Sequence, residues 1–75
     1  MNTFIVKMIE NEDNVRIDIL NEKNAFHAEE YFKKRGYKTV RAYRDMGQLK
    51  DILENCKKEY KQVVLSPQVQ FRGIA

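Results

Sequence analysis

Hydrophobic residues recur at every second position in two segments near the start of the chain, residues 3–9 and 15–20. A period of two is the pattern of a β-strand with one face against a core. The residues that separate the two segments, 10–14, are Glu-Asn-Glu-Asp-Asn. This is a turn composition, and its two asparagines tolerate the positive φ angles of tight turns. We therefore predict a β-hairpin over residues 3–20.

A helical pattern follows the hairpin. Asn24 is a suitable N-cap for a helix over residues 25–35. Three hydrophobic residues are spaced to form the core-facing side of this helix: Ala25, Ala28 and Phe32. Gly36 fits the left-handed position that ends many helices, and Tyr37 can close over the last turn.

Alternation returns in residues 38–44, which we expect to form a third strand. Asp45 and Gln48 are spaced as in a capping box and open a second helix, predicted over residues 46–61. The hydrophobic stripe of this helix recurs at helical spacing: Met46, Leu49, Leu53, Cys56 and Tyr60.

The hydrophobic run at residues 63–65 predicts a short strand, and Pro67 belongs at the end or edge of a strand. We expect residues 66–75 to form an edge strand or a mobile tail. The order ββαβα(β) indicates one α+β domain over residues 1–75. In this domain, two helices pack on one face of a three- or four-stranded sheet, antiparallel or mixed.

Length and hydropathy limit the class of protein. The chain has 75 residues and its longest hydrophobic runs are three residues, whereas a membrane-spanning helix needs about 20. Its start lacks the basic stretch and long hydrophobic segment of a secretory leader. Its single cysteine cannot form an intramolecular disulfide. We therefore expect a cytoplasmic protein that does not bind membranes.

Charge is distributed unevenly along the chain, whose net charge is +3. Residues 1–30 carry three basic and seven acidic side chains, and residues 31–75 carry eleven basic and four acidic ones. This asymmetry and the small core of a short chain favour self-association of unlike ends, so we expect a homodimer. The alternative is that the fold interleaves the two halves and averages their fields.

Catalytic and cofactor-binding groups are scarce. The chain has one serine, one histidine and one cysteine (Ser66, His27 and Cys56), far apart in sequence. Nucleophilic catalysis needs a base and an orienting group beside the nucleophile. The three glycines are isolated, so no phosphate-binding loop is present, and the acidic turn lacks the glycine and closing glutamate of an EF-hand. We therefore predict a non-enzymatic protein without a metal or other cofactor.

Cationic and aromatic residues are concentrated in residues 31–44. If Val40 and Ala42 face the core, the odd-numbered residues of that strand are displayed together on its other face. Such a surface suits nucleic acid or an acidic protein, and the alternative is a solvated face without a partner. The candidate binding residues are Lys33, Lys34, Arg35, Tyr37, Lys38, Arg41, Tyr43 and Arg44. A second, acidic candidate contact lies at the hairpin turn and consists of Glu10, Glu12 and Asp13.

Lysine, asparagine and isoleucine, whose codons are rich in A and T, account for 21 of the 75 residues. In this composition, its short length and its lack of enzyme motifs, the chain resembles the small accessory proteins of bacteriophages of low-GC hosts. We therefore expect a protein-binding module that regulates or inhibits a larger partner in the replication or transcription machinery of a host cell. The alternative is a nucleic-acid-binding domain that uses residues 31–44.

Overall fold

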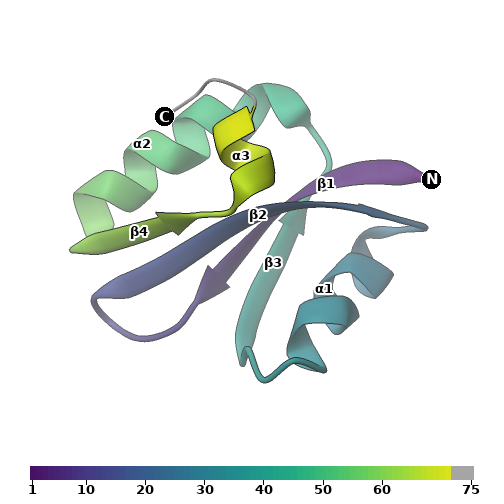
Figure 1. Ribbon diagram of the computed structural model, residues 1–75, viewed down its shortest axis with the longest axis horizontal. Helices are drawn as coiled ribbons and strands as arrows, with labels where there is room; N and C mark the ends of the chain where they lie inside the picture. Colours follow the sequence, from purple (N-terminus) through teal and green to yellow (C-terminus); the bar gives the residue numbers. More distant parts are fainter. Residues whose placement is uncertain (72–75) are drawn as a thin grey trace.

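A four-stranded mixed sheet forms the centre of the molecule in the computed structural model, which describes residues 1–71 (Figure 1). Its strands are β1 (Asn2–Ile9), β2 (Asn14–Glu22), β3 (Thr39–Tyr43) and β4 (Gln62–Leu65). They lie in the order β3-β1-β2-β4. β1 pairs antiparallel with both β2 and β3, whereas β4 pairs parallel with β2. With its helices, this sheet confirms the predicted α+β class and the mixed alternative for the sheet.

The predicted hairpin is confirmed as β1 and β2, and its turn uses an asparagine side chain. Asn11 Oδ1 accepts hydrogen bonds of 2.9 Å from the N–H groups of Asp13 and Asn14. No non-glycine residue in the described part of the chain has a positive φ. The turn therefore uses the hydrogen-bonding capacity of asparagine and not its tolerance of positive φ.

Helix α1 (Ala25–Lys33) begins at the predicted residue and ends two residues before the predicted end. The Asn24 side chain accepts a hydrogen bond of 2.9 Å from the His27 N–H and caps the first turn. At the other end, Gly36 has a φ of +100°. The N–H groups of Gly36 and Tyr37 donate to carbonyl oxygens of the last turn, which is the Schellman arrangement.

Helix α2 (Leu49–Glu59) starts later than the sequence predicts. A turn of 3₁₀-helix, η1 (Met46–Gln48), precedes it. Asp45 Oδ1 accepts a hydrogen bond of 2.9 Å from the Gly47 N–H. A capping box would require this bond to come from the Gln48 N–H instead. The cap therefore closes the tighter 3₁₀ turn, and the α-helix begins only after it.

The two main helices cover opposite faces of the sheet (Figure 1), so the predicted placement of both on one face is wrong. The reason lies in β1, where Phe4, Ile5 and Val6 are all buried and both faces need cover. The core under α1 contains Phe4, Val6, Met8, Ala28, Phe32 and Val40. The core under α2 contains Ile5, Val15, Ile17, Ile19, Leu49, Leu53, Cys56 and Val69.

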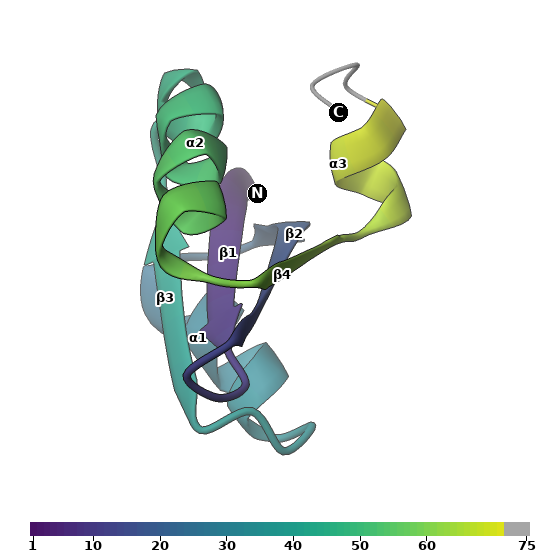
Figure 2. The same ribbon diagram turned by 90° about the vertical axis from the view of Figure 1, so that its left-hand side faces the viewer.

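A third helix, α3 (Pro67–Phe71), stands where the sequence predicts an edge strand or mobile tail over residues 66–75. Figure 2 shows β4 running from the end of α2 to the start of α3. Pro67 suits the first helical position, which needs no N–H partner. Val69 is fully buried and joins the core under α2, which fixes this segment as a helix. The rest of the predicted tail, residues 72–75, lies outside the described residues.

Candidate functional site

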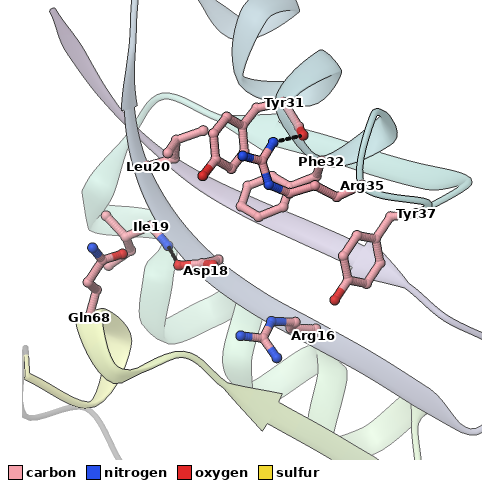
Figure 3. A pocket seen from close by; sticks show the side chains of 9 residues that line it. All are labelled: Arg16, Asp18, Ile19, Leu20, Tyr31, Phe32, Arg35, Tyr37 and Gln68. Carbon is pink, nitrogen blue, oxygen red and sulfur yellow. Dashed lines mark hydrogen bonds between the residues drawn. The ribbon is translucent and has the colours of Figure 1, made fainter.

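A cleft of about 400 Å³ opens between β2 and the C-terminal half of α1 (Figure 3). Helix α1 packs mainly over β1 and β3, so it leaves part of β2 uncovered on this face. Helix α3 contributes one residue, Gln68, which lies beyond the end of β4 and beside Asp18 and Ile19 of β2. The lining residues are Arg16, Asp18, Ile19, Leu20, Tyr31, Phe32, Arg35, Tyr37 and Gln68.

The alternation of β2 points Arg16 and Asp18 into the cleft. The residues between and beside them, Val15, Ile17 and Ile19, are buried against the core under α2. Because successive side chains of a strand point to opposite faces, the arginine and the aspartate lie on the α1 side, where both are half-buried. A cation and an anion therefore stand side by side on the floor of the cleft.

The wall of the cleft is a stack of side chains at the end of α1. The Arg35 guanidinium carbon lies 3.6 Å from the centroid of the Tyr31 ring. Its Nη1 also donates a hydrogen bond of 2.8 Å to the Tyr31 carbonyl. Tyr31 and Tyr37 both meet Phe32 edge to face, with centroid distances of 5.0 and 6.2 Å. The stack orders the guanidinium in advance, which lowers the entropy lost when it binds a ligand.

Asp18 and Gln68 give the cleft acceptor and amide groups. Asp18 Oδ1 accepts a hydrogen bond of 2.7 Å from the Ile19 N–H. When the Gln68 amide is oriented so that both its oxygen and its nitrogen have suitable partners, the nitrogen donates a hydrogen bond of 3.1 Å to Asp18 Oδ1. In Figure 3, Arg16 makes no hydrogen bond with the other residues drawn. Its guanidinium can therefore serve a ligand without first losing a partner within the cleft.

Neither the histidine nor the cysteine of the chain lines the cleft. Cys56 is buried under α2, on the other side of the sheet, while His27 is exposed on α1. Burial raises the pKa of the Cys56 thiol more than the Lys7 ammonium lowers it. Within residues 1–71, no three aspartate, glutamate, histidine or cysteine side chains gather to hold a metal ion. In the same part of the chain, no helix has the length and hydrophobicity to cross a membrane.

The structure divides the predicted basic-aromatic surface between two sides of the sheet. Val40 and Ala42 pack toward α1, so Arg41 and Tyr43 point to the α2 side. Tyr37 precedes β3 and does not continue its alternation; it packs on the α1 side. The sequence predicts that Tyr37 shares a face with Arg41 and Tyr43. This prediction is wrong, because Tyr37 lies on the opposite side of the sheet.

Three other predicted binding residues lie near the two ends of this stretch. Lys33 and Lys34 are exposed at the C-terminal end of α1, next in sequence to the Arg35 of the cleft. Arg44 follows β3 and donates a hydrogen bond of 3.4 Å to Asn2 Oδ1. The lysines can extend the cleft, whereas Arg44 belongs to the other end of β3.

The acidic candidate residues lie at the tip of the hairpin, where Glu10, Glu12 and Asp13 are exposed. One small pocket of about 290 Å³ is lined by Glu10 and by Lys38, which is also one of the predicted binding residues. The acidic turn is therefore next to the loop that follows α1. At this point the fold brings the acidic half of the chain beside the basic half.

Three cleft residues with charged or amide side chains, Arg16, Asp18 and Gln68, are absent from the set of binding residues predicted from the sequence. The first two read as the solvated face of a half-buried strand. The signal that could have found them is in β1, whose consecutive hydrophobic residues require cover on both faces of the sheet. Arg16 and Asp18 of the neighbouring strand β2 then lie on a face of the sheet that a helix covers in part. Gln68 has no comparable signal, because its segment reads as a strand.

Comparisons with known proteins give no information on function, so the function is inferred from the structure. No protein-family model, curated protein or solved structure matches the chain. The chemistry of the described side chains therefore carries the argument that follows.

Proposed function

We propose that the protein is a non-enzymatic binding module that regulates or inhibits a larger protein by holding one of its segments in the cleft. The observation that carries the proposal is the mixture of charges there. Arg16 and Arg35 supply cationic donors, and Asp18 supplies an anionic acceptor. A protein segment offers carboxylate and carbonyl acceptors together with N–H donors, so it can satisfy both kinds of group.

The same mixture argues against a phosphate backbone as the ligand of the cleft. Cations attract phosphates, but the half-buried Asp18 repels them, and a partly buried charge is screened less than an exposed one. An acidic side chain of a protein can bind Arg16 or Arg35 while a neighbouring amide donates to Asp18. Ordered tyrosines and arginines, as in the α1 stack, are the residues that dominate protein interfaces.

The partner that suits this cleft presents an acidic segment. From length and composition, we assign the protein to the small accessory proteins of bacteriophage type and its target to the replication or transcription machinery of a host cytoplasm. The acidic hairpin tip offers a second contact, at Glu10, Glu12 and Asp13, for a basic part of the same target. Opposite charges at two sites would fix the orientation of the partner.

Direct nucleic-acid binding by residues 31–44 stays a prediction with less support. A single surface of this kind needs the cations and tyrosines of the stretch on one face. Arg35 and Tyr37 line the cleft, whereas Arg41 and Tyr43 point to the other side of the sheet. A strand of nucleic acid along one face therefore reaches only part of the set.

Affinity capture from a nuclease-treated bacterial lysate tests the protein-binding function. Arg35→Glu reverses a cleft cation, and Lys50→Glu makes the same charge change at an exposed position of α2. We expect proteins captured by wild type and Lys50→Glu to be lost with Arg35→Glu. The affinity of the purified partner for Arg35→Glu should fall about tenfold or more, or about 1.4 kcal/mol. Equal capture by all three proteins, or no capture, would contradict the proposal.

A further inference from the structure

Two cations lie directly opposite each other on the side of the sheet that faces away from the cleft. Lys7 of β1 and Arg41 of β3 are partners in the antiparallel register. Like charges in directly opposed positions destabilise a sheet. An anion bound between the two side chains would remove this repulsion, and the folded protein would gain stability from its binding.

Each of these cations lies beside a tyrosine ring. Lys7 Nζ is 5.8 Å from the centroid of Tyr60, and Arg41 Cζ is 5.4 Å from the centroid of Tyr43. Such contacts hold a cation in place without neutralising its charge. Both tyrosines are half-buried at the margin of the core under α2, which limits the motion of their rings. We call these four side chains the β1–β3 strip.

Carboxylates are absent from the strand positions that share this face within the described residues. The β1 and β3 positions on this face are Thr3, Ile5, Lys7, Ile9, Thr39, Arg41 and Tyr43. The positions of β2 and β4 on this face carry no charge and are Val15, Ile17, Ile19, Asn21, Val63 and Leu65. Helix α2 contributes Glu59, whose carboxylate raises the pKa of the Cys56 thiol, whereas the Lys7 ammonium lowers it. The strands themselves therefore present positive charge only.

We propose that the β1–β3 strip binds single-stranded nucleic acid, with phosphates beside Lys7 and Arg41 and a base stacked on the Arg41–Tyr43 pair. A phosphate backbone supplies repeated anions for adjacent cations, and every base has a flat face for a guanidinium or a ring. β3 is at the edge of the sheet, so the strip is open on its outer side. An extended strand can pass along it.

An acidic peptide that joins β3 as a further strand fits this surface less well. Such a peptide needs the outward backbone groups of β3. The Ala42 N–H is already occupied, because it donates a hydrogen bond of 3.0 Å to Glu29 Oε2. The Glu29 carboxylate also repels an acidic chain at this edge. Nucleic acid needs no backbone hydrogen bond from β3, and along the strip it lies on the α2 side of the sheet, opposite the side that α1 and its Glu29 cover.

Fluorescence anisotropy of a labelled oligothymidylate, titrated at several salt concentrations, tests the proposal. Arg41→Glu and Lys7→Gln change the strip, and Lys23→Glu makes the Arg41→Glu charge change at an exposed position between β2 and α1. We expect Arg41→Glu to weaken binding about tenfold or more, and Lys23→Glu less than about twofold. With two phosphate contacts, log affinity falls with log salt at a slope of about −1.4 or steeper, and Lys7→Gln flattens it by about 0.7.

Circular dichroism checks that each variant is folded, and Arg41→Gln replaces Arg41→Glu if the charge reversal unfolds the chain. The absence of oligothymidylate binding at low salt would overturn the proposal, and so would equal losses with Arg41→Glu and Lys23→Glu. Tighter binding of oligoglutamate with the same dependence on Arg41 would assign the strip to an acidic protein and also overturn it. The cleft is tested separately, because Arg35→Glu should leave oligothymidylate binding unchanged.

Discussion

Cys56 lies in the core under α2 with 1 % of its surface exposed. This agrees with its position on the hydrophobic stripe of the helix. Burial raises the pKa of its thiol, the Lys7 ammonium opposes the rise, and the Glu59 carboxylate adds to it. The thiol is therefore neutral and shielded at physiological pH, which makes it a small hydrophobic residue and a poor nucleophile.

We expect this thiol to make the free energy of unfolding depend on pH above the ordinary cysteine pKa of 9.0. The unfolded chain ionises there, whereas the folded protein keeps the proton to higher pH. The stabilisation is complete below that pKa and is lost as the pH rises through the raised folded pKa. Urea unfolding from about pH 7 to about pH 10 should show wild type losing stability relative to Cys56→Ala. A constant difference would mean that the thiol ionises equally in both states.

At the scale of elements, the end of α1 depends on the backbone of Gly36, whose φ is +100°. A Cβ at this position would meet no atom within 4 Å, so the backbone conformation alone selects glycine. The turn that Gly36 allows brings Tyr37 against Phe32, with ring centroids 6.2 Å apart. A single glycine therefore shapes one wall of the cleft.

We expect Gly36→Ala to lower the free energy of unfolding by about 1 kcal/mol, because alanine adopts a positive φ only at a cost. Gly36→Asn should cost less, since asparagine tolerates this region of φ better. Chemical denaturation of the three proteins measures the order. An alanine variant as stable as wild type would show that the end of α1 relaxes into another turn.

Local signals predicted most of the elements, because caps and turns are encoded over a few residues. Asn24 and Gly36 mark the ends of α1 through their own side chain and backbone. Helix α3 gives no such signal. Val69 and Phe71 are two residues apart, which reads as a strand, and five residues are too few for a helical repeat. Burial of Val69 by tertiary packing determines the outcome.

At the scale of the whole molecule, a side chain blocks part of each sheet edge. On β3, Glu29 accepts a hydrogen bond of 3.0 Å from the Ala42 N–H. On β4, the Gln70 amide donates a hydrogen bond of 3.0 Å to the Leu65 carbonyl. This carbonyl points away from β2, because the N–H of the same peptide group, that of Ser66, bonds inward. Both contacts occupy groups that could pair with another chain.

We expect Glu29→Ala to increase self-association, because it exposes the Ala42 N–H at an open strand edge. Glu29→Gln is the matched control, since it keeps an acceptor oxygen at the same position. Sedimentation velocity at tens of micromolar should show larger species for the alanine variant than for wild type or Glu29→Gln. Equal masses for all three would mean that Glu29 does not protect the edge. The same measurement tests the predicted homodimer of wild type, which stays a prediction.

The arrangement of the elements was the least predictable part of the molecule. Phe4, Ile5 and Val6 form a consecutive hydrophobic run, which suits a strand covered on both faces, but the run does not say which helix covers which face. The structure shows all three residues buried, with one helix on each face. With both helices on one face, Arg16 and Asp18 would have been in solvent, so the error in placement hid the cleft. Arg35 was found because its residue type and its aromatic neighbours carry information without tertiary structure.

Alternate residues of the hairpin serve two separate cores, and this has a consequence for evolution. A change such as Phe32→Leu alters packing under α1, and the compensating substitutions are to be found on that side of the sheet. The core under α2 draws on the other side chains of the same strands. Substitutions can therefore accumulate on one face of the sheet while the packing of the opposite face is retained.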